Sequence, residues 1–155
     1  MHRSSGALKL PLLMKGCLSF TDILDVGRPQ IAETQRVGDA FPGPDTPGAR
    51  EAFTRQVRLL EGIVIHTYGV AATLTRKADG LPEVAETWQS MSRFCQEALQ
   101  VLTRLKHKYS YCGTPELYDL VLDYKLASDR RHKGALEEIE CQKMELPKGL
   151  LPDLN

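Results

Sequence analysis

The side chains that could perform chemistry in this chain are four cysteines and four histidines, and their spacing matches no familiar site. The strongest pair is His66 and Cys95, because the helix pairing described below brings the two close together, and a Cys–His pair can form a nucleophile. The sequence supplies no third group to orient the histidine and no glycine-rich oxyanion loop. We therefore expect no catalytic residue, and we interpret Cys95 as a small buried hydrophobic side chain.

The remaining cysteines and histidines are poorly placed to bind a metal ion. No CxxC pair occurs, so the cysteines form no zinc framework. His107 and Cys112 are five residues apart, which places them off a single helical face, and His132 and Cys141 belong to other predicted elements. The sequence also has no glycine loop of the kind that binds a nucleotide phosphate. We expect neither a metal ion nor a cofactor.

Basic side chains gather in two short runs, residues 104–108 and 130–133. The 20 Lys and Arg residues are balanced by 20 Asp and Glu residues, so no overall field draws the chain to nucleic acid or to an anionic membrane. Runs of this kind usually form a solvated helix face, although they could contact phosphate or an acidic partner. Weak nucleic-acid binding, with an affinity that falls as salt rises, is kept as an alternative function.

The N-terminal residues allow two interpretations. No acidic residue precedes Asp22, and Arg3, Lys9 and Lys15 stand among Leu, Met and Ser, a composition that resembles a mitochondrial transit peptide. The single Arg and the helix-breaking Pro11 favour a disordered tail instead. No stretch approaches the roughly 20 apolar residues of a membrane span. Widely spaced cysteines indicate reduced thiols, so we expect an intracellular protein, cytoplasmic or nuclear, with mitochondria as the alternative.

The chain divides into three parts. Residues 28–48 contain four prolines, which predicts a flexible linker, and the short stretch before it is expected to form one or two helical turns or a docking peptide. We therefore assign residues 1–48 to a flexible tail and linker. Residues 49–146 form a helical bundle domain, and residues 147–155 form a C-terminal tail.

Helical periodicity begins after the linker. An antiparallel hairpin of helices is predicted over residues 49–77 and 82–110, with Gly80 suited to a left-handed cap between them. A third helix is predicted over residues 115–133. Gly134 follows a charge run and is expected to separate it from a short helix over residues 135–145, which ends before Pro147.

The two long helices carry matching apolar seams with alternating steps of four and three residues, the repeat of helix-on-helix packing. In an antiparallel register, the small Ala71 lies opposite Trp88 and the small Ala98 lies opposite Leu60, which fills a core without voids. The seam residues are Phe53, Val57, Leu60, Val64, Thr67, Ala71 and Leu74 of the first helix and Val84, Trp88, Met91, Cys95, Ala98, Leu102, Leu105 and Tyr109 of the second.

A second apolar stripe lies beside this seam, and its side chains would stay exposed to solvent in a two-helix hairpin. The third helix, with an apolar stripe of its own, suits this groove and would complete an elongated all-α three-helix bundle. A helix from another chain could fill the groove in its place. The residues predicted to bind a partner are Ile63, Val70, Phe94 and Val101 in the groove, Arg130, Arg131 and Lys133 in the basic run, and Leu136 and Ile139 in the short helix.

These features favour a non-catalytic helical adaptor or structural subunit of a multiprotein complex that acts through coiled-coil-like helix packing. The layout is similar to that of small helical subunits of large assemblies such as Mediator or lysosome-biogenesis complexes, in architecture alone. We expect other helical protein subunits as partners in a hetero-oligomer, and neither nucleic acid nor a membrane. The alternatives are a mitochondrial assembly factor with an N-terminal targeting segment and a weak nucleic-acid-binding helical protein.

Overall fold

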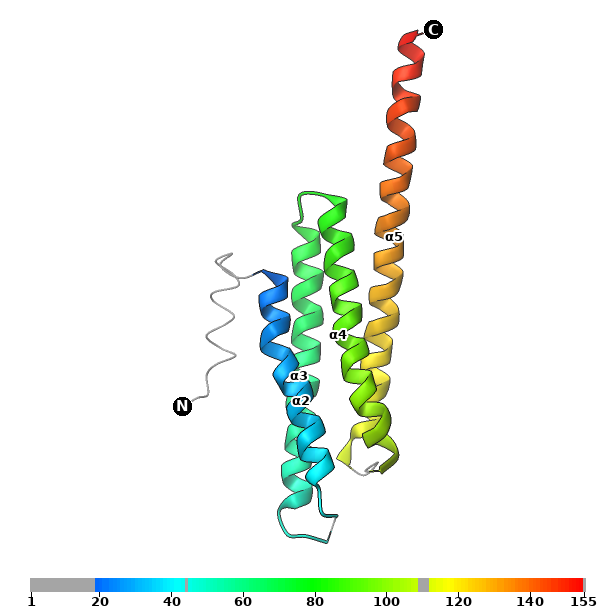
Figure 1. Cartoon of the computed structure of the whole chain (residues 1–155). Helices are drawn as coiled ribbons and strands as arrows, with labels where there is room; N and C mark the ends of the chain where they lie inside the picture. The colour runs from blue at the N-terminus through cyan, green and yellow to red at the C-terminus, as the bar shows by residue number, and fades with distance from the viewer. Residues whose placement is uncertain (1–18, 44, 109–111, 155) are drawn as a thin grey trace.

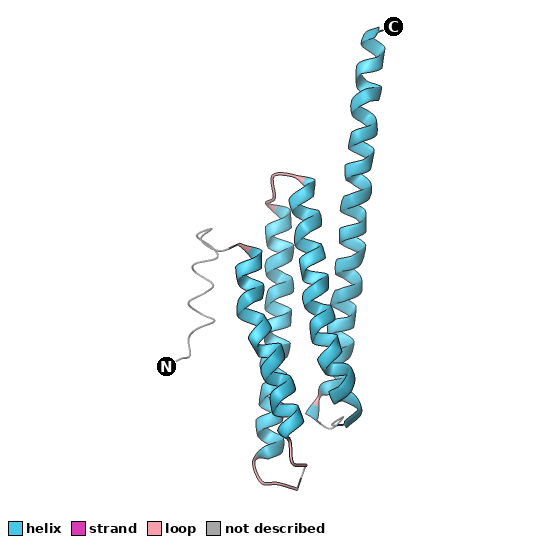
Figure 2. Cartoon of the chain, in the orientation of Figure 1, coloured by secondary structure: helices cyan, strands magenta, loops and turns pink. Residues whose placement is uncertain are grey.

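The computed structural model describes residues 19–43, 45–108 and 112–154, and within these ranges it leaves the side chains of residues 106–108 and 145–154 undescribed. The predicted tail over residues 1–18 therefore lies outside the described residues. The described part is all-helical, without strands, which confirms the predicted class (Figures 1 and 2). Its helices are α2 (Phe20–Ala40), α3 (Ala49–Arg76), α4 (Leu81–Lys108) and α5 (Thr114–Leu154).

Helices α3 and α4 form the antiparallel hairpin that the sequence predicts (Figure 1). The turn between them differs in detail, because Gly80 does not adopt the left-handed conformation expected of it. The end of α3 is instead capped at Lys77, whose backbone N–H donates to the carbonyl of Leu74 at 3.1 Å.

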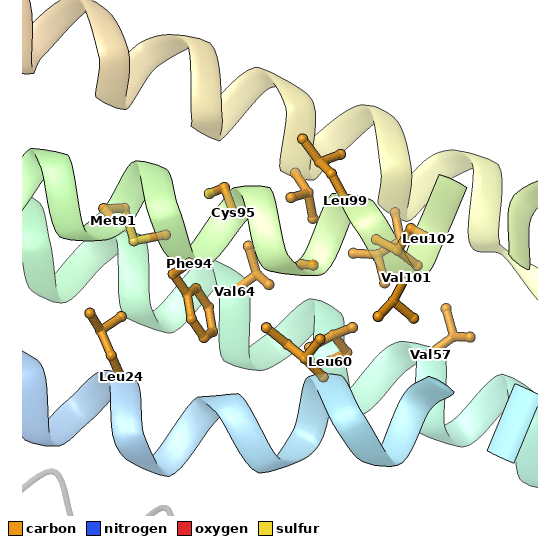
Figure 3. Close-up of a cluster of buried hydrophobic side chains, with 14 of the residues drawn as sticks. Leu24, Val57, Leu60, Val64, Met91, Phe94, Cys95, Leu99, Val101 and Leu102 are labelled. Atoms are coloured by element: carbon orange, nitrogen blue, oxygen red, sulfur yellow. The ribbon is translucent and has the colours of Figure 1, made fainter. Parts of the chain in front are cut away.

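The predicted seam forms the centre of the hydrophobic core. Most seam residues of both helices are fully or almost fully buried, and Figure 3 shows several of them pointing into one cluster between the helices. Leu74 and Val84, at the tip of the hairpin, are partly buried against that cluster. For the seam residues that the structure describes, the alternating spacing of apolar residues therefore identified the core of the hairpin correctly, while Tyr109 lies outside the described residues.

The prediction of a flexible linker is wrong for residues 28–40, which belong to α2. The helix begins with a capping box, in which the Asp22 N–H donates to Ser19 Oγ at 3.1 Å and the Ser19 N–H donates to Asp22 Oδ2 at 3.0 Å. Pro29 lies inside the helix but on its exposed side. The hydrogen bond that proline removes is thus lost where water can replace it, so the helix continues.

Helix α2 fills the groove beside the hairpin seam, so the prediction that the helix from residue 115 fills it is also wrong. A Cβ on Gly27 would lie 2.9 Å from Phe94 and 3.3 Å from Ile63, which shows how closely the α2 backbone approaches both helices of the hairpin. Figure 3 shows Leu24 of α2 and Phe94 of α4 in the same cluster. At the rim, Arg28 Nε donates to Glu97 Oε1 at 2.9 Å.

Helix α5 packs on the opposite flank of α4 from α2 (Figure 1). It is one continuous helix from Thr114 to Leu154, so the predicted break at Gly134 and the predicted helix end before Pro147 are both wrong. The predicted C-terminal tail over residues 147–155 is wrong for residues 147–154, which belong to this helix. A glycine inside a helix costs only about 1 kcal/mol relative to alanine, which the buried Ala135 and the other packed residues of α5 outweigh.

Among the described residues, α3 has the length and apolar composition that a membrane-spanning helix requires, contrary to expectation. A core helix passes the same test, and the face of α3 from Phe53 to Ala71 is buried in the bundle. The absence of a membrane span therefore stays a prediction.

The close approach of α2 predicts the effect of adding one methyl group. Gly27→Ala is expected to lower the free energy of unfolding by about 1–2 kcal/mol, because overpacking against the fully buried Phe94 outweighs the gain in helix propensity. Gly62→Ala on α3 is the matched control. Its Cβ would meet no atom within 4 Å, so the same change should raise stability by about 0.5–1 kcal/mol.

Urea-induced unfolding followed by circular dichroism measures both changes. An equal rise in stability for the two variants would contradict the packing of α2 against Phe94.

Candidate protein-interaction surface

A continuous stack of side chains fixes α5 against the hairpin. The ring of Tyr124 on α5 stacks on Tyr68 of α3, with centroids 4.2 Å apart and planes within 7°. Tyr68 also packs against Trp88 of α4 at 5.3 Å, and the guanidinium of Arg131 on α5 lies 4.8 Å from the Trp88 ring centroid. Aromatic pairs and cation–π contacts of this kind stabilise by about 0.5–1.5 kcal/mol each. They determine which face of α5 remains outside.

A polar contact between α4 and α5 lies close to this stack. Lys125 Nζ donates to Asp129 Oδ2 at 2.8 Å, and the hydroxyl of Ser92 on α4 donates to the other carboxylate oxygen of Asp129. Partial burial opposes ionisation of Asp129, but these two hydrogen bonds, together with the positive charges of Lys125 and His132, hold the pKa of the carboxyl below its usual range. The arrangement favours a charged Asp129 that fastens α5 to α4.

The two residues of the candidate Cys–His pair have opposite environments. Cys95 is fully buried, and burial raises the pKa of its thiol to about 12. His66 is exposed on the outer side of α3. A protonated, enclosed thiol is a poor nucleophile, so the environment of Cys95 fits a packing role.

The other candidate ligands do not gather into a metal centre. Within the part of the chain that the structure describes, no three His, Cys, Asp or Glu side chains lie close enough to hold a metal ion. Cys112 is buried and Cys141 is exposed on α5, while the side chain of His107 lies outside the described residues.

The residues predicted to line the partner groove are covered from within the chain. Val70, Phe94 and Val101 are buried, and Ile63 is partly buried in the core that includes α2. The structure therefore does not leave these four side chains on an open surface.

The predicted partner residues on α5 are more accessible. Arg130, Lys133 and Leu136 are exposed, and Ile139 is partly buried. Arg131 is exposed as well but lies over Trp88, so this member of the basic run is in contact with the core. The structure thus separates the predicted partner residues into a buried set and an accessible set on α5.

A cleft of about 420 Å³ lies where α5 leaves the tip of the α3–α4 hairpin. Trp88, Leu81 and Val84 form its apolar part, and Arg76 and Glu138 add charge at its edges. The sequence placed Leu81 in the predicted turn and the other four residues in predicted helices. It gave no sign of a cleft, because a break was expected at Gly134.

Helix α5 continues beyond this cleft without support from the other described helices (Figure 1). It has 41 residues and α4 has 28, so at about 1.5 Å per residue it is roughly 20 Å longer. The exposed apolar residues along α5 include Leu126, Leu136 and Met144. Leu126 and Met144 were missed from the sequence, although their helical spacing from Arg130 and Lys133 places all four on one face.

A second exposed face lies on α3, where Leu59 and Ile65 are about half exposed. Gly62 and Gly69 stand beside them, and a methyl group added to either would meet no atom within 4 Å. This face is basic at one end, with Arg55 exposed, but no described residue indicates what covers it.

Comparison with known protein families, with characterised proteins and with solved structures finds no match to this chain.

The buried environment of Cys95 predicts its reactivity. In the native protein at pH 8, we expect an alkylating reagent to modify Cys141 rapidly and Cys95 only after unfolding, because the Cys95 thiol is both enclosed and protonated. Peptide mass spectrometry before and after addition of denaturant measures each site. Equal rates for the two thiols in the native state would contradict this assignment.

The lowered pKa of Asp129 predicts how stability depends on pH. The charged carboxylate stabilises the fold above its unfolded pKa, and this contribution is lost as pH falls through the lower folded pKa. Asp129→Asn should therefore be less stable than the parent at neutral pH, with the difference shrinking in acid. The control Asp123→Asn changes an exposed carboxylate of the same helix and should show a smaller effect at neutral pH in thermal melts. A constant difference across pH would contradict the assignment.

Proposed function

We propose that this protein is a non-catalytic helical adaptor or structural subunit of a multiprotein complex that acts through helix–helix packing. The observation that carries this proposal is the end of α5, which projects beyond the bundle. Most of the stability of a protein helix comes from tertiary packing of one face, and the end of α5 packs on no other described helix, so a bound partner would stabilise it.

The projecting end offers a docking surface that continues the core. The buried stripe of α5 passes through Leu117, Val121, Ser128 and Ala135, and Ile139 follows on the same face just beyond the cleft. A helix of another subunit placed there would extend the α3–α4 hairpin and cover Ile139 together with the apolar wall of the cleft. This is the helix-in-groove form of recognition.

A role without catalysis is supported by the chemistry of the described side chains. The Cys95 thiol is enclosed, and the cleft combines an indole with charges of both signs. The hydroxyl of Thr75, which also lines the cleft, donates to the backbone carbonyl of Ala71 at 2.9 Å. The free thiols of Cys95, Cys112 and Cys141 fit the intracellular location that we propose. The mitochondrial alternative depends on residues 1–18, which lie outside the described residues.

A protein partner is favoured over nucleic acid by the charges on α5. Arg130 and Lys133 share their exposed face with Glu137 and Glu140, so the face is not uniformly basic. Alternating blocks of charge match a protein helix of complementary pattern better than a row of phosphates.

The test uses the tagged full-length chain to capture its partner, followed by reconstitution with the purified partner. We expect the partner to raise the melting temperature of the parent chain. The variant Leu136→Arg/Ile139→Arg should bind the partner about tenfold or more weakly than the parent does. Leu59→Arg/Ile65→Arg is the matched control, since Leu59 is 48% exposed and Leu136 44% exposed.

The control should bind as the parent does, and circular dichroism should show that both variants remain helical. A partner that binds both variants equally, or a chain that melts sharply and captures no reproducible protein, would refute the proposed function.

A further inference from the structure

We infer that two copies of this chain pair through the outer face of α5, antiparallel and about a two-fold axis level with Ala135. This inference rests on the proposed function, because it identifies a second copy as one partner of α5. It uses the face of α5 opposite to the one that packs on the hairpin, so the docking surface at Ile139 stays available.

The outer face is a single exposed stripe with alternating steps of three and four residues. Leu126 is 46% exposed and Met144 is 71% exposed, which makes Met144 the most exposed large apolar side chain of the described residues. Four charged residues lie between them, Arg130, Lys133, Glu137 and Glu140, and all are exposed. The spacing keeps all six side chains on one side of the helix, with apolar residues at its two ends and charges that could form interhelical ion pairs between them.

The stripe is complementary to itself when it is reversed. Leu126 and Met144 lie nine residues before and after Ala135, so an antiparallel partner places Leu126 against Met144. The same register places Arg130 opposite Glu140 and Lys133 opposite Glu137, and the two-fold axis repeats each pair. At about 1.5 Å per residue, the matched stretch is roughly 27 Å long.

Three features of the structure leave this face free to pair. Within the described part of the chain, Arg130, Lys133 and Glu137 make no ion pair, and Glu140 contacts only Lys143 at 3.7 Å between two well-exposed side chains. Gly134 lies next to the level of the two-fold axis and has no side chain, and a Cβ added to it would meet no atom within 4 Å. The α5 backbones of the two copies can therefore approach closely at this point. The hairpin lies along the other side of α5 (Figure 1).

The arrangement of charges also selects the direction of pairing. In a parallel pair, residues of equal number face each other, so Arg130 would face Arg130 and Glu137 would face Glu137. Like charges at such positions destabilise, whereas the antiparallel register pairs opposite charges throughout. The exposed face of α3 lacks any such self-complementary pattern, since basic residues predominate along it at Arg55, Arg58 and Arg76.

The decisive experiment reverses the charges in two variants of the full chain and then mixes them. Arg130→Glu/Lys133→Glu makes the stripe wholly acidic, and Glu137→Lys/Glu140→Lys makes it wholly basic. Sedimentation equilibrium should show dimers of the parent chain at low salt, monomers of each variant alone, and a heterodimer in the equimolar mixture. Raising the salt from 50 to 500 mM shortens the Debye length from about 14 Å to about 4 Å and screens the ion pairs. The dissociation constant of the parent dimer should therefore rise about tenfold or more.

The control variant Arg55→Glu/Arg58→Glu changes the same number of charges on the exposed face of α3 and should dimerise as the parent does. Circular dichroism of every variant separates loss of pairing from loss of the helix. Disulfide trapping then tests the register in a Cys141→Ser background. Leu126→Cys mixed with Met144→Cys should cross-link, and Leu126→Cys alone should not.

A parent chain that remains monomeric at low salt would overturn the inference, as would charge-reversed variants that still pair alone or fail to pair when mixed. If self-association fails while an identified partner still requires Leu136 and Ile139, the inference falls and the proposed function stands. If the chain dimerises as described but no other partner binds, the proposed hetero-oligomeric role falls while the α5 pairing stands.

Discussion

The packing of α2 against Phe94 is the contact on which the rest of the structure depends. Gly27 brings the α2 backbone so close to the Phe94 ring and to Ile63 that no other helix can occupy this groove. Once α2 lies there, the remaining open flank of the hairpin is the one with Tyr68 and Leu99, and α5 packs on that flank. Gly27, which no sequence pattern singled out, therefore allows the close packing that determines how the four described helices are arranged.

The position of α5 then decides which of its faces can meet another molecule. The stack of Tyr124, Tyr68, Trp88 and Arg131 turns one side of α5 inward. The hydrogen bond from Ser92 of α4 to Asp129 fixes the height of α5 along α4. The opposite side of α5 is exposed to solvent and carries a basic pair, Arg130 and Lys133, followed by an acidic pair, Glu137 and Glu140. Because α5 is longer than α4, the same inward side emerges beyond the bundle at Ile139. One helix thus presents two distinct faces: an inner one that emerges beyond the bundle at Ile139, and an outer one on which exposed Leu126 and Met144 flank a run of charges.

Much of the hairpin could be predicted because its signals are local and regular. The alternating seam from Phe53 to Leu105 identified α3, α4 and the core between them, since apolar residues repeat with the helix period wherever one face is buried. Helix α2 carried signals of the same kind, namely the Ser19–Asp22 capping box and the apolar series Phe20, Ile23, Leu24 and Ile31. The prolines concealed it, because a sequence does not reveal whether Pro29 faces the core or the solvent.

The amino-acid sequence by itself determined the helical class, the seam of the hairpin and the charge pattern of α5, because each depends on residues close together along the chain. Only the tertiary structure decided that α2 rather than α5 covers Phe94, that α5 passes Gly134 without a break, and which side of α5 faces outward. These outcomes depend on competition between helices for the same apolar groove. Such a competition is settled by shape and close approach in three dimensions, and no local pattern records it.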